Sequence, residues 1–132
     1  MLGLDTNVLV RLLIEDDAAQ TQRARKLVDT AVAAQEIVLV SLPVLLETEW
    51  VLRSRYEIPP EVILGLFRAA LETRELAFED EAAVEEALFN WQDGHSGFSD
   101  CLIMAHNRQL GCRSTATFDA RAARLPGASR MS

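Results

Sequence analysis

The sequence predicts an α/β fold with a mainly parallel sheet that helices cover on both faces. Two observations predict it. Short apolar runs alternate with amphipathic helical segments along the chain, and these runs are continuously apolar, as in strands buried on both faces. We expect one domain, because 132 residues can bury about two thirds of their unfolded surface.

The first element is a short strand that ends at Asp5, followed by a helix that ends near Ile14. An aspartate at this junction can cap the helix, since its carboxylate accepts a backbone N–H of the first turn. It can also anchor an active site, because ligands collect at the carboxyl ends of strands in α/β sheets. Both interpretations of Asp5 are open at this point.

Each of the next two predicted helices has a sequence signal at its N-terminus, acidic residues for the first and a proline for the second. Residues 15–17 are acidic and cap a predicted helix over residues 18–34, and residues 37–40 form a second strand rich in β-branched side chains. Pro43 then lies in the first turn of a helix that continues to Arg53. The inward face predicted for the helix over residues 18–34 comprises Ala24, Leu27, Val28, Ala31 and Val32.

The second half of the chain repeats the alternation. A turn at residues 58–60 precedes a helix over residues 61–71, and residues 76–78 form a third strand. The helix over residues 61–71 is predicted to bury Val62, Leu66, Ala69 and Ala70. The next helix, capped by residues 79–81, ends at Trp91 and is predicted to bury Val84, Ala87, Leu88 and Trp91.

The C-terminal segment contains one more helix and strand. A helix is predicted from Phe98 to Leu110, closed by Gly111 in the left-handed conformation that ends many helices. A fourth strand over residues 114–117 and a helical turn over residues 120–124 follow, and the chain is predicted to fray from about residue 127.

The bulk composition excludes few classes of protein. A net charge of −7 is unusual for electrostatic capture of nucleic acid but compatible with an acidic, cation-binding active site. The chain has neither a signal-peptide pattern nor a long apolar stretch, so we expect a cytoplasmic protein. Cys101 and Cys112 lack metal-site spacing and are predicted to be reduced, buried or semi-buried thiols.

Four acids stand at positions where an active site can form. Asp5 and Asp119 each follow an apolar strand, and Glu47 and Asp100 each lie early in a helix. Each alone is compatible with a cap, a turn or a solvated surface. Carboxylates about 5 Å apart repel by roughly 3 kcal/mol per pair at an effective dielectric near 20, so a cluster needs a cation. Hard oxygen ligands favour Mg²⁺ or Mn²⁺, which support phosphoryl chemistry.

Four segments of the chain, in order, resemble the motifs of the PIN domain family, and most closely the VapC-like ribonuclease toxins of bacterial toxin–antitoxin pairs. They are residues 4–10 (LDTNVLV), 46–53 (LETEWVLR), 98–103 (FSDCLI) and 117–119 (TFD). The resemblance covers nearly the whole chain, and it implies a three-layer α/β/α fold whose central sheet has four or five strands.

The resemblance also implies a function and a site. It implies an endoribonuclease in which a water activated by Mg²⁺ or Mn²⁺ attacks a phosphodiester and leaves a 5′-phosphate. It implies a homodimer, a small antitoxin protein as partner, and second-shell hydrogen bonds from Asn7 and Thr117. The metal-site acids that it implies are Asp5, Glu47, Asp100 and Asp119.

The sequence departs from the family pattern in two places. Glu49 occupies a position that is usually apolar, and the chain ends too soon for a full last edge strand. Because Glu47 and Glu49 lie about 200° apart on a helix, only one can face the site. The family pattern favours Glu47, and we expect Glu49 to pair with Arg53 at i+4 on the far face.

Two other functions are compatible with parts of the sequence. A phosphohydrolase with Asp5 as nucleophile would usually carry a second aspartate two residues on, where Asn7 stands. A degenerate PIN-like domain would bind RNA or protein without cleavage, but the full set of acids argues against decay.

Further polar and aromatic residues have less specific interpretations. Trp50 and Trp91 are predicted to lie in the core or an interface rather than to form base-stacking platforms, His95 to be a solvated loop residue rather than a substrate contact, and His106 to be structural. The candidate phosphate-binding residues, equally compatible with solvated helix positions, are Arg53, Arg55, Arg108, Arg121 and Arg124.

Overall fold

A computed structural model describes residues 1–132 with the exception of His95, so the interpretation of that residue lies outside the described part. The chain forms two compact units, residues 1–79 and residues 80–132. That they form one domain stays a prediction.

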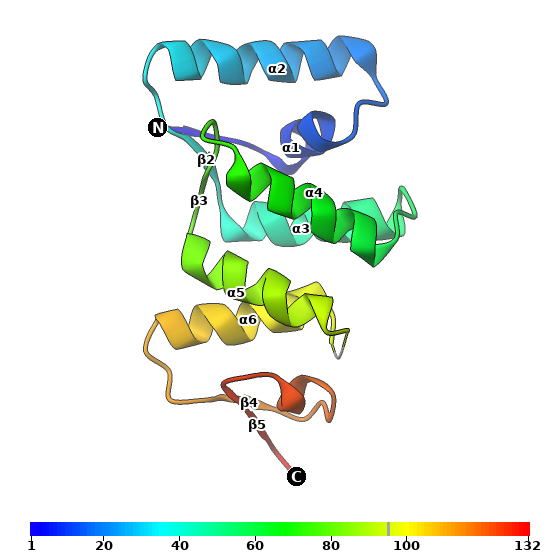
Figure 1. The fold of residues 1–132 in the computed structure, drawn as a ribbon, viewed down its shortest axis with the longest axis vertical. Coiled ribbons are helices and arrows are strands. Elements are labelled where there is room, and N and C mark those ends of the chain that lie inside the picture. Colours follow the sequence, from blue (N-terminus) through cyan, green and yellow to red (C-terminus); the bar gives the residue numbers. More distant parts are fainter. Residues whose placement is uncertain (95) are drawn as a thin grey trace. The chain divides into compact units, whose positions relative to one another are not determined.

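The first unit contains a parallel sheet of three short strands (Figure 1). The order is β1 (Leu2–Gly3), β2 (Val38–Val40) and β3 (Ala77–Phe78). Leu2 pairs with Val38, and Val40 pairs with Phe78. The three predicted strands and their parallel direction are therefore confirmed.

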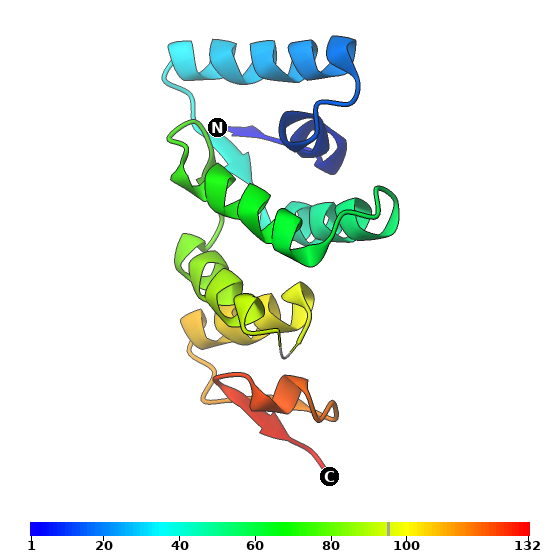
Figure 2. The same ribbon diagram turned by 45° about the vertical axis from the view of Figure 1, so that its right-hand side comes forward.

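Four helices accompany this sheet: α1 (Thr6–Leu13), α2 (Ala18–Ala33), α3 (Leu42–Ser54) and α4 (Pro60–Glu72). Figures 1 and 2 both show α2 on the opposite side of the strands from α3 and α4. Each helix begins within one residue of the predicted start, and Pro43 lies in the first turn of α3. The first unit thus has helices on both faces of a parallel sheet, as the α/β class requires.

The buried face of α2 is narrower than predicted. Ala24, Val28 and Ala31 are buried, whereas Leu27 and Val32 are 42% and 43% exposed. The three buried residues follow i, i+4 and i+7 spacing, and the predicted wider stripe would need a second neighbouring element to cover it. The prediction was wrong for Leu27 and Val32.

The structure buries a different face of α4 from the one predicted. Ile63, Phe67 and Ala70 are buried, while Val62 and Ala69 are exposed and Leu66 is half-buried. Residues 62–67 contain five large apolar side chains and one glycine, so periodicity alone does not select a face. Packing inside the first unit selects the face that carries Phe67.

The second unit begins with two helices, α5 (Glu81–Gln92) and α6 (Phe98–Gln109). The predicted apolar face of α5 is confirmed, since all four of its residues are buried. Trp91 on this face packs on Phe98 with ring centroids 5.2 Å apart. Asp80 caps α5 by accepting the Ala83 N–H, and its backbone is left-handed with φ of 51°.

The C-terminal residues form a strand that the sequence analysis does not predict. β4 (Thr115–Thr117) is followed by a short 3₁₀ helix (Ala122–Arg124) and then β5 (Ala128–Arg130), which pairs with β4 in parallel. The expectation of a frayed tail from about residue 127 is wrong for residues 128–130. Among the described residues the strands form one sheet of three and one of two, so the α/β fold class is confirmed with sheets smaller than the four or five strands predicted.

Gly127 stands immediately before β5 and has a left-handed backbone with φ of 83°. A Cβ placed there would come within 2.5 Å of Cδ of Arg108. The left-handed backbone therefore favours glycine, and a larger residue would also have to displace the flexible Arg108 side chain.

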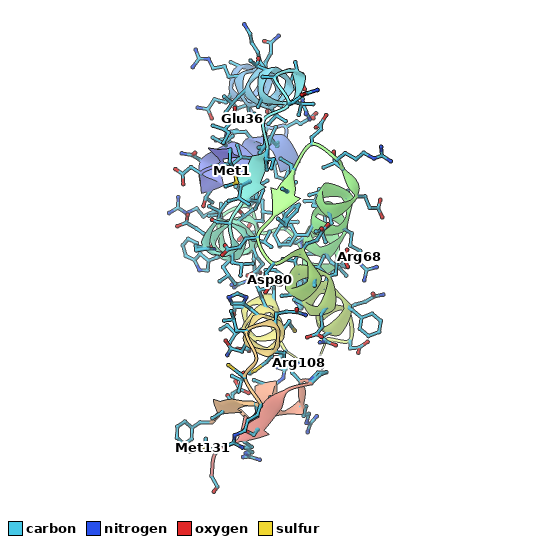
Figure 3. All side chains as sticks on the ribbon, turned by 90° about the vertical axis from the view of Figure 1, so that its left-hand side faces the viewer. Met1, Glu36, Arg68, Asp80, Arg108 and Met131 are labelled. Carbon is cyan, nitrogen blue, oxygen red and sulfur yellow. The ribbon has the colours of Figure 1, made fainter. Side chains whose placement is uncertain are left out.

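Three further features are an ion pair at the N-terminus, the state of the two thiols, and the character of the described helices with respect to membranes. The amino group of Met1 lies 3.5 Å from the carboxylate of Glu36, and Figure 3 labels both residues. Both cysteines are free; Cys101 is buried as predicted, but Cys112 is exposed. Across the described residues, no helix combines the length and apolar character that crossing a bilayer requires.

Candidate active site

Asp5 occupies the junction between β1 and α1 and caps the helix. Its Oδ1 accepts the N–H of Thr6 at 2.8 Å, and its backbone is extended, as an N-cap requires. The side chain is nevertheless exposed. Asp5 therefore caps α1 while its carboxylate remains open to a ligand.

Glu47 is held at this junction by a contact between distant parts of the sequence. The hydroxyl of Thr6 donates to Oε1 of Glu47 at 2.5 Å, which joins the first turn of α1 to the middle of α3. A short O–H···O⁻ hydrogen bond of this kind is charge-assisted. The Thr6 side chain is buried, so it positions the exposed Glu47 carboxylate from the interior side of the pocket.

Asp5 and Glu47 line one pocket of about 300 Å³, which we call the acid pocket. Its rim also carries Arg11, whose Nη1 donates to the Tyr56 hydroxyl at 2.9 Å. This hydrogen bond, together with the charge of Asp16, raises the pKa of the Arg11 guanidinium, which stays protonated. The full lining is Asp5, Thr6, Asn7, Val10, Arg11, Glu47, Trp50, Val51, Arg55 and Tyr56.

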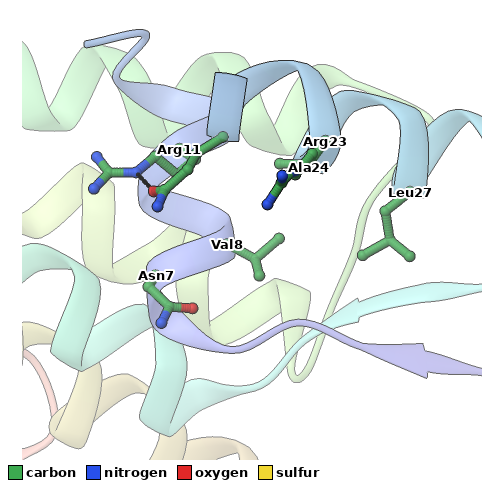
Figure 4. Close-up of a pocket in the computed structure, with 7 residues that line it drawn as sticks. Asn7, Val8, Arg11, Arg23, Ala24 and Leu27 are labelled. Atoms are coloured by element: carbon green, nitrogen blue, oxygen red, sulfur yellow. Dashed lines mark hydrogen bonds between the residues drawn. The ribbon is translucent and has the colours of Figure 1, made fainter. Parts of the chain in front are cut away.

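A second pocket, of about 440 Å³, lies between α1 and α2 (Figure 4). Arg11 crosses it, and its Nε donates to Gln20 at 2.5 Å. The lining is Asn7, Val8, Arg11, Gln20, Arg23, Ala24 and Leu27. It contains no carboxylate, so the acid pocket is the better candidate for chemistry.

The second glutamate of α3 behaves as predicted in its pairing. Oε2 of Glu49 accepts from Nε of Arg53 at 2.8 Å, one helical turn away. Glu49 does not line the acid pocket, but its side chain is only 7% exposed. The predicted ion pair is confirmed, although its acid is buried.

The two acids of the second unit have local partners. Oδ2 of Asp100 accepts the Ser96 hydroxyl at 2.7 Å, four residues away. Oδ1 of Asp119 accepts the N–H groups of Arg121 and Ala122 at 2.7 and 3.0 Å. These two backbone N–H groups hold the pKa of Asp119 below its ordinary value.

The structure brings Asp5 and Glu47 together and places Asp100 and Asp119 in the second unit. Neither unit, over the described residues, gathers three or more Asp, Glu, His or Cys side chains around one point. A joint site of all four acids stays a prediction. Of the two supporting residues, Asn7 lines the acid pocket, and Oγ1 of Thr117 accepts the N–H of Asp119 at 3.1 Å.

The candidate phosphate-binding arginines have different surroundings. Arg53 pairs with Glu49, and Arg108 pairs with Glu86 at 3.1 Å. Arg121 donates to the carbonyl of Gly94 at 3.5 Å, while Arg124 is exposed. Arg55 is the candidate that lines the acid pocket.

The sequence analysis missed four side chains at the predicted acids. Thr6, Arg11 and Tyr56 belong to the acid pocket, and Ser96 holds Asp100. Thr6 stands between Asp5 and Asn7 in the first motif, so that motif carried a signal for it. No local pattern predicts the contact between Arg11 and Tyr56, which are 45 residues apart.

Comparison with known protein families identifies the family of this chain. A family model described as "PIN domain" matches residues 3–128, nearly the entire chain. A search of curated proteins finds no match.

Proposed function

Because the chain belongs to the PIN domain family, whose members are generally nucleases, we propose that it is an endoribonuclease dependent on Mg²⁺ or Mn²⁺. The observation that carries the proposal is the acid pocket, where Asp5 and Glu47 expose carboxylates beside each other and beside basic side chains. A phosphodiester is the substrate class that an acidic, cation-binding pocket with arginines at its rim can bind.

The chemistry of the donors fits a hard divalent cation. The acid pocket offers carboxylate oxygens from Asp5 and Glu47 and contains no thiol or imidazole. We propose that these two acids hold the cation together with Asp100 and Asp119. When bound, such a cation lowers the pKa of a water molecule and offsets the negative charge of the phosphodiester.

The remaining side chains of the pocket position groups around this chemistry. The Thr6 hydroxyl fixes one oxygen of Glu47 and leaves the other to accept from water or bind a cation. Arg55 and Arg11 place positive charge at the rim, where a phosphate oxygen would approach. Thr117 fixes the backbone turn that presents the Asp119 carboxylate.

The cellular role that we propose is that of a toxin in a toxin–antitoxin pair. The order and spacing of the four motifs support it, because they resemble those of VapC-like toxins. The proposal includes a cytoplasmic location, a homodimer and a small antitoxin protein that blocks the acid pocket.

The test is cleavage of mixed RNAs by the purified protein with Mg²⁺, with Mn²⁺ and with a chelator. We expect metal-dependent products with 5′-phosphate ends, and no cleavage in chelator. Single-stranded DNA of matched length is the substrate control. RNA binding without cleavage under any metal would instead establish a binding domain and overturn the enzymatic proposal.

A further inference from the structure

Trp50 is a large aromatic side chain that the acid pocket leaves exposed. It stands on α3 one turn after Glu47, lines the acid pocket, and is 47% exposed. The second tryptophan of the chain, Trp91, is 9% exposed and packs on Phe98. The prediction of a core or interface position is therefore wrong as to the core, the interface stays a prediction, and the part of the ring that Arg55 leaves uncovered is open to a ligand.

The side chains around Trp50 make its ring suited to planar, polar ligands. The guanidinium of Arg55 lies over the indole, 5.6 Å from its centroid, a cation–π contact that orients the ring. The other pocket neighbours include Asp5, Asn7 and Arg11, which are charged or polar. The lining combines these groups with the apolar Val10 and Val51, so it offers an aromatic face together with polar groups that can orient a ligand.

Base stacking is an interaction that uses both an exposed aromatic ring and a neighbouring guanidinium. Nucleic-acid bases stack on aromatic side chains regardless of their sequence, and arginine adds a cation–π contribution. In single-stranded RNA the unpaired bases are available for such stacking. A base that stacks on Trp50 would lie in the same pocket as the carboxylates of Asp5 and Glu47.

We propose that Trp50, held by Arg55, is the platform on which the acid pocket stacks one base of a single-stranded RNA next to the phosphodiester it cleaves. The inference rests on the proposed function and deepens it. It assigns substrate binding to Trp50, and a preference for single strands, because a base paired inside a duplex cannot reach the ring.

The first test measures binding without cleavage. Replacing Trp91 with Phe leaves Trp50 as the sole tryptophan, so its fluorescence reports on the acid pocket. We expect short oligouridylate, titrated in chelator, to quench this fluorescence saturably, and a matched duplex RNA to quench it far less. Anisotropy of a labelled oligouridylate gives the affinity independently of tryptophan.

The second test compares substitutions at the ring. Trp50→Ala should weaken anisotropy-measured binding by roughly 5- to 150-fold, the equilibrium equivalent of stacking one base. Trp50→Phe should restore most of that affinity, because it keeps an aromatic face. In metal-dependent cleavage, Trp50→Ala should raise KM more than it lowers kcat. Val62→Ala is the matched control, since Val62 is also 47% exposed but lies outside the acid pocket.

Three outcomes would overturn the inference. RNA affinity equal to wild type in Trp50→Ala, with cleavage intact in the wild type, would refute the platform and leave the proposed function standing. A change in self-association of the RNA-free protein on Trp50→Ala, with unchanged RNA binding, would assign the ring to an interface between copies. A wild-type protein that neither binds nor cleaves RNA would refute both proposals.

Discussion

Asp5 accepts from the adjacent Thr6, but Glu47 of the first unit and the two candidate acids of the second unit are held by contacts of different range. In the first unit Glu47 depends on the hydroxyl of Thr6, a partner 41 residues away. In the second unit Asp100 depends on Ser96, and Asp119 on the N–H groups of Arg121 and Ala122, all within four residues. The acid pocket therefore exists only when α1 and α3 pack together, whereas the acids of the second unit are arranged by their own segments.

This difference separates what a local motif encodes from what tertiary packing supplies. A turn such as the one at Asp119 forms from its own backbone donors, as Asx turns generally do. The neighbours of Asp5 come from several elements, and one of them, Arg11, also crosses the second pocket. Substitutions in the first unit should consequently show larger and less local effects.

The largest expected effect is the loss of RNA cleavage when an acid of the first unit is replaced. Glu47→Gln and Asp5→Asn should each lower cleavage by orders of magnitude, because each removes a charge proposed to hold the cation. Both variants should fold, since Asn caps a helix about as well as Asp and Gln still accepts from Thr6. RNA cleavage and thermal melts in chelator would be measured side by side.

The control for this comparison is Glu49→Gln, on the same helix but outside the acid pocket. It should keep cleavage near the wild-type level. If the Glu49 variant were inactive and the Glu47 variant active, the cation would lie on the side of α3 that carries Glu49, and the assignment to Glu47 would be wrong.

The second effect is stabilisation by metal. If carboxylates of the folded protein share a cation that the unfolded chain cannot organise, the free energy of unfolding rises by about 2.7 kcal/mol at 100 times the dissociation constant. Thermal unfolding across Mg²⁺ and Mn²⁺ concentrations would measure it, with Asp5→Asn showing a smaller rise. A melting temperature indifferent to both metals in the millimolar range would contradict a shared cation.

A smaller effect isolates the long-range hydrogen bond. Thr6→Val keeps the shape of the side chain but removes the donor to Glu47, and should cost roughly 1 kcal/mol of stability. Thr6→Ser keeps the hydroxyl and should retain most of the stability and the activity. Chemical denaturation gives the free energies, and a loss in Thr6→Ser with none in Thr6→Val would show that the methyl group, not the hydroxyl, matters.

The smallest effect concerns the local site at Asp119. Since the backbone N–H groups of Ala122 and Arg121 lower its pKa in the folded state, the group favours folding above the unfolded pKa near 3.9. This contribution is lost as pH falls through the lower, folded pKa. NMR titration should give Asp119 a midpoint below 3.9, and a midpoint at or above that value would refute the turn. Asp119→Asn should flatten the corresponding acid-range slope of stability.

The parts of the fold that could be predicted from sequence are those with one dominant local signal. The face of α5 was predicted because its large apolar residues recur at one spacing between polar ones. The face of α4 was not, because apolar residues surround the helix axis and only packing selects Ile63 and Phe67. The strand at residues 128–130, with the sequence Ala-Ser-Arg, has little β-propensity of its own and forms by pairing with β4.

The candidate site shows the same division. The sequence predicted the acids Asp5 and Glu47 because each belongs to a recognisable motif, and the structure places both in one pocket. It could not predict Trp50 as an exposed pocket residue, since its apolar neighbours along α3 suggest a buried one. Exposure depends on which elements cover a side chain, and this information is absent from local spacing.

The two cysteines give the protein a built-in handle for chemical labelling. Burial raises the pKa of the Cys101 thiol to about 11, so at neutral pH almost none of it is the reactive thiolate. Cys112 is exposed just beyond α6. A maleimide dye should therefore attach to Cys112 alone in the folded protein, which yields a singly modified reporter without removing a native residue.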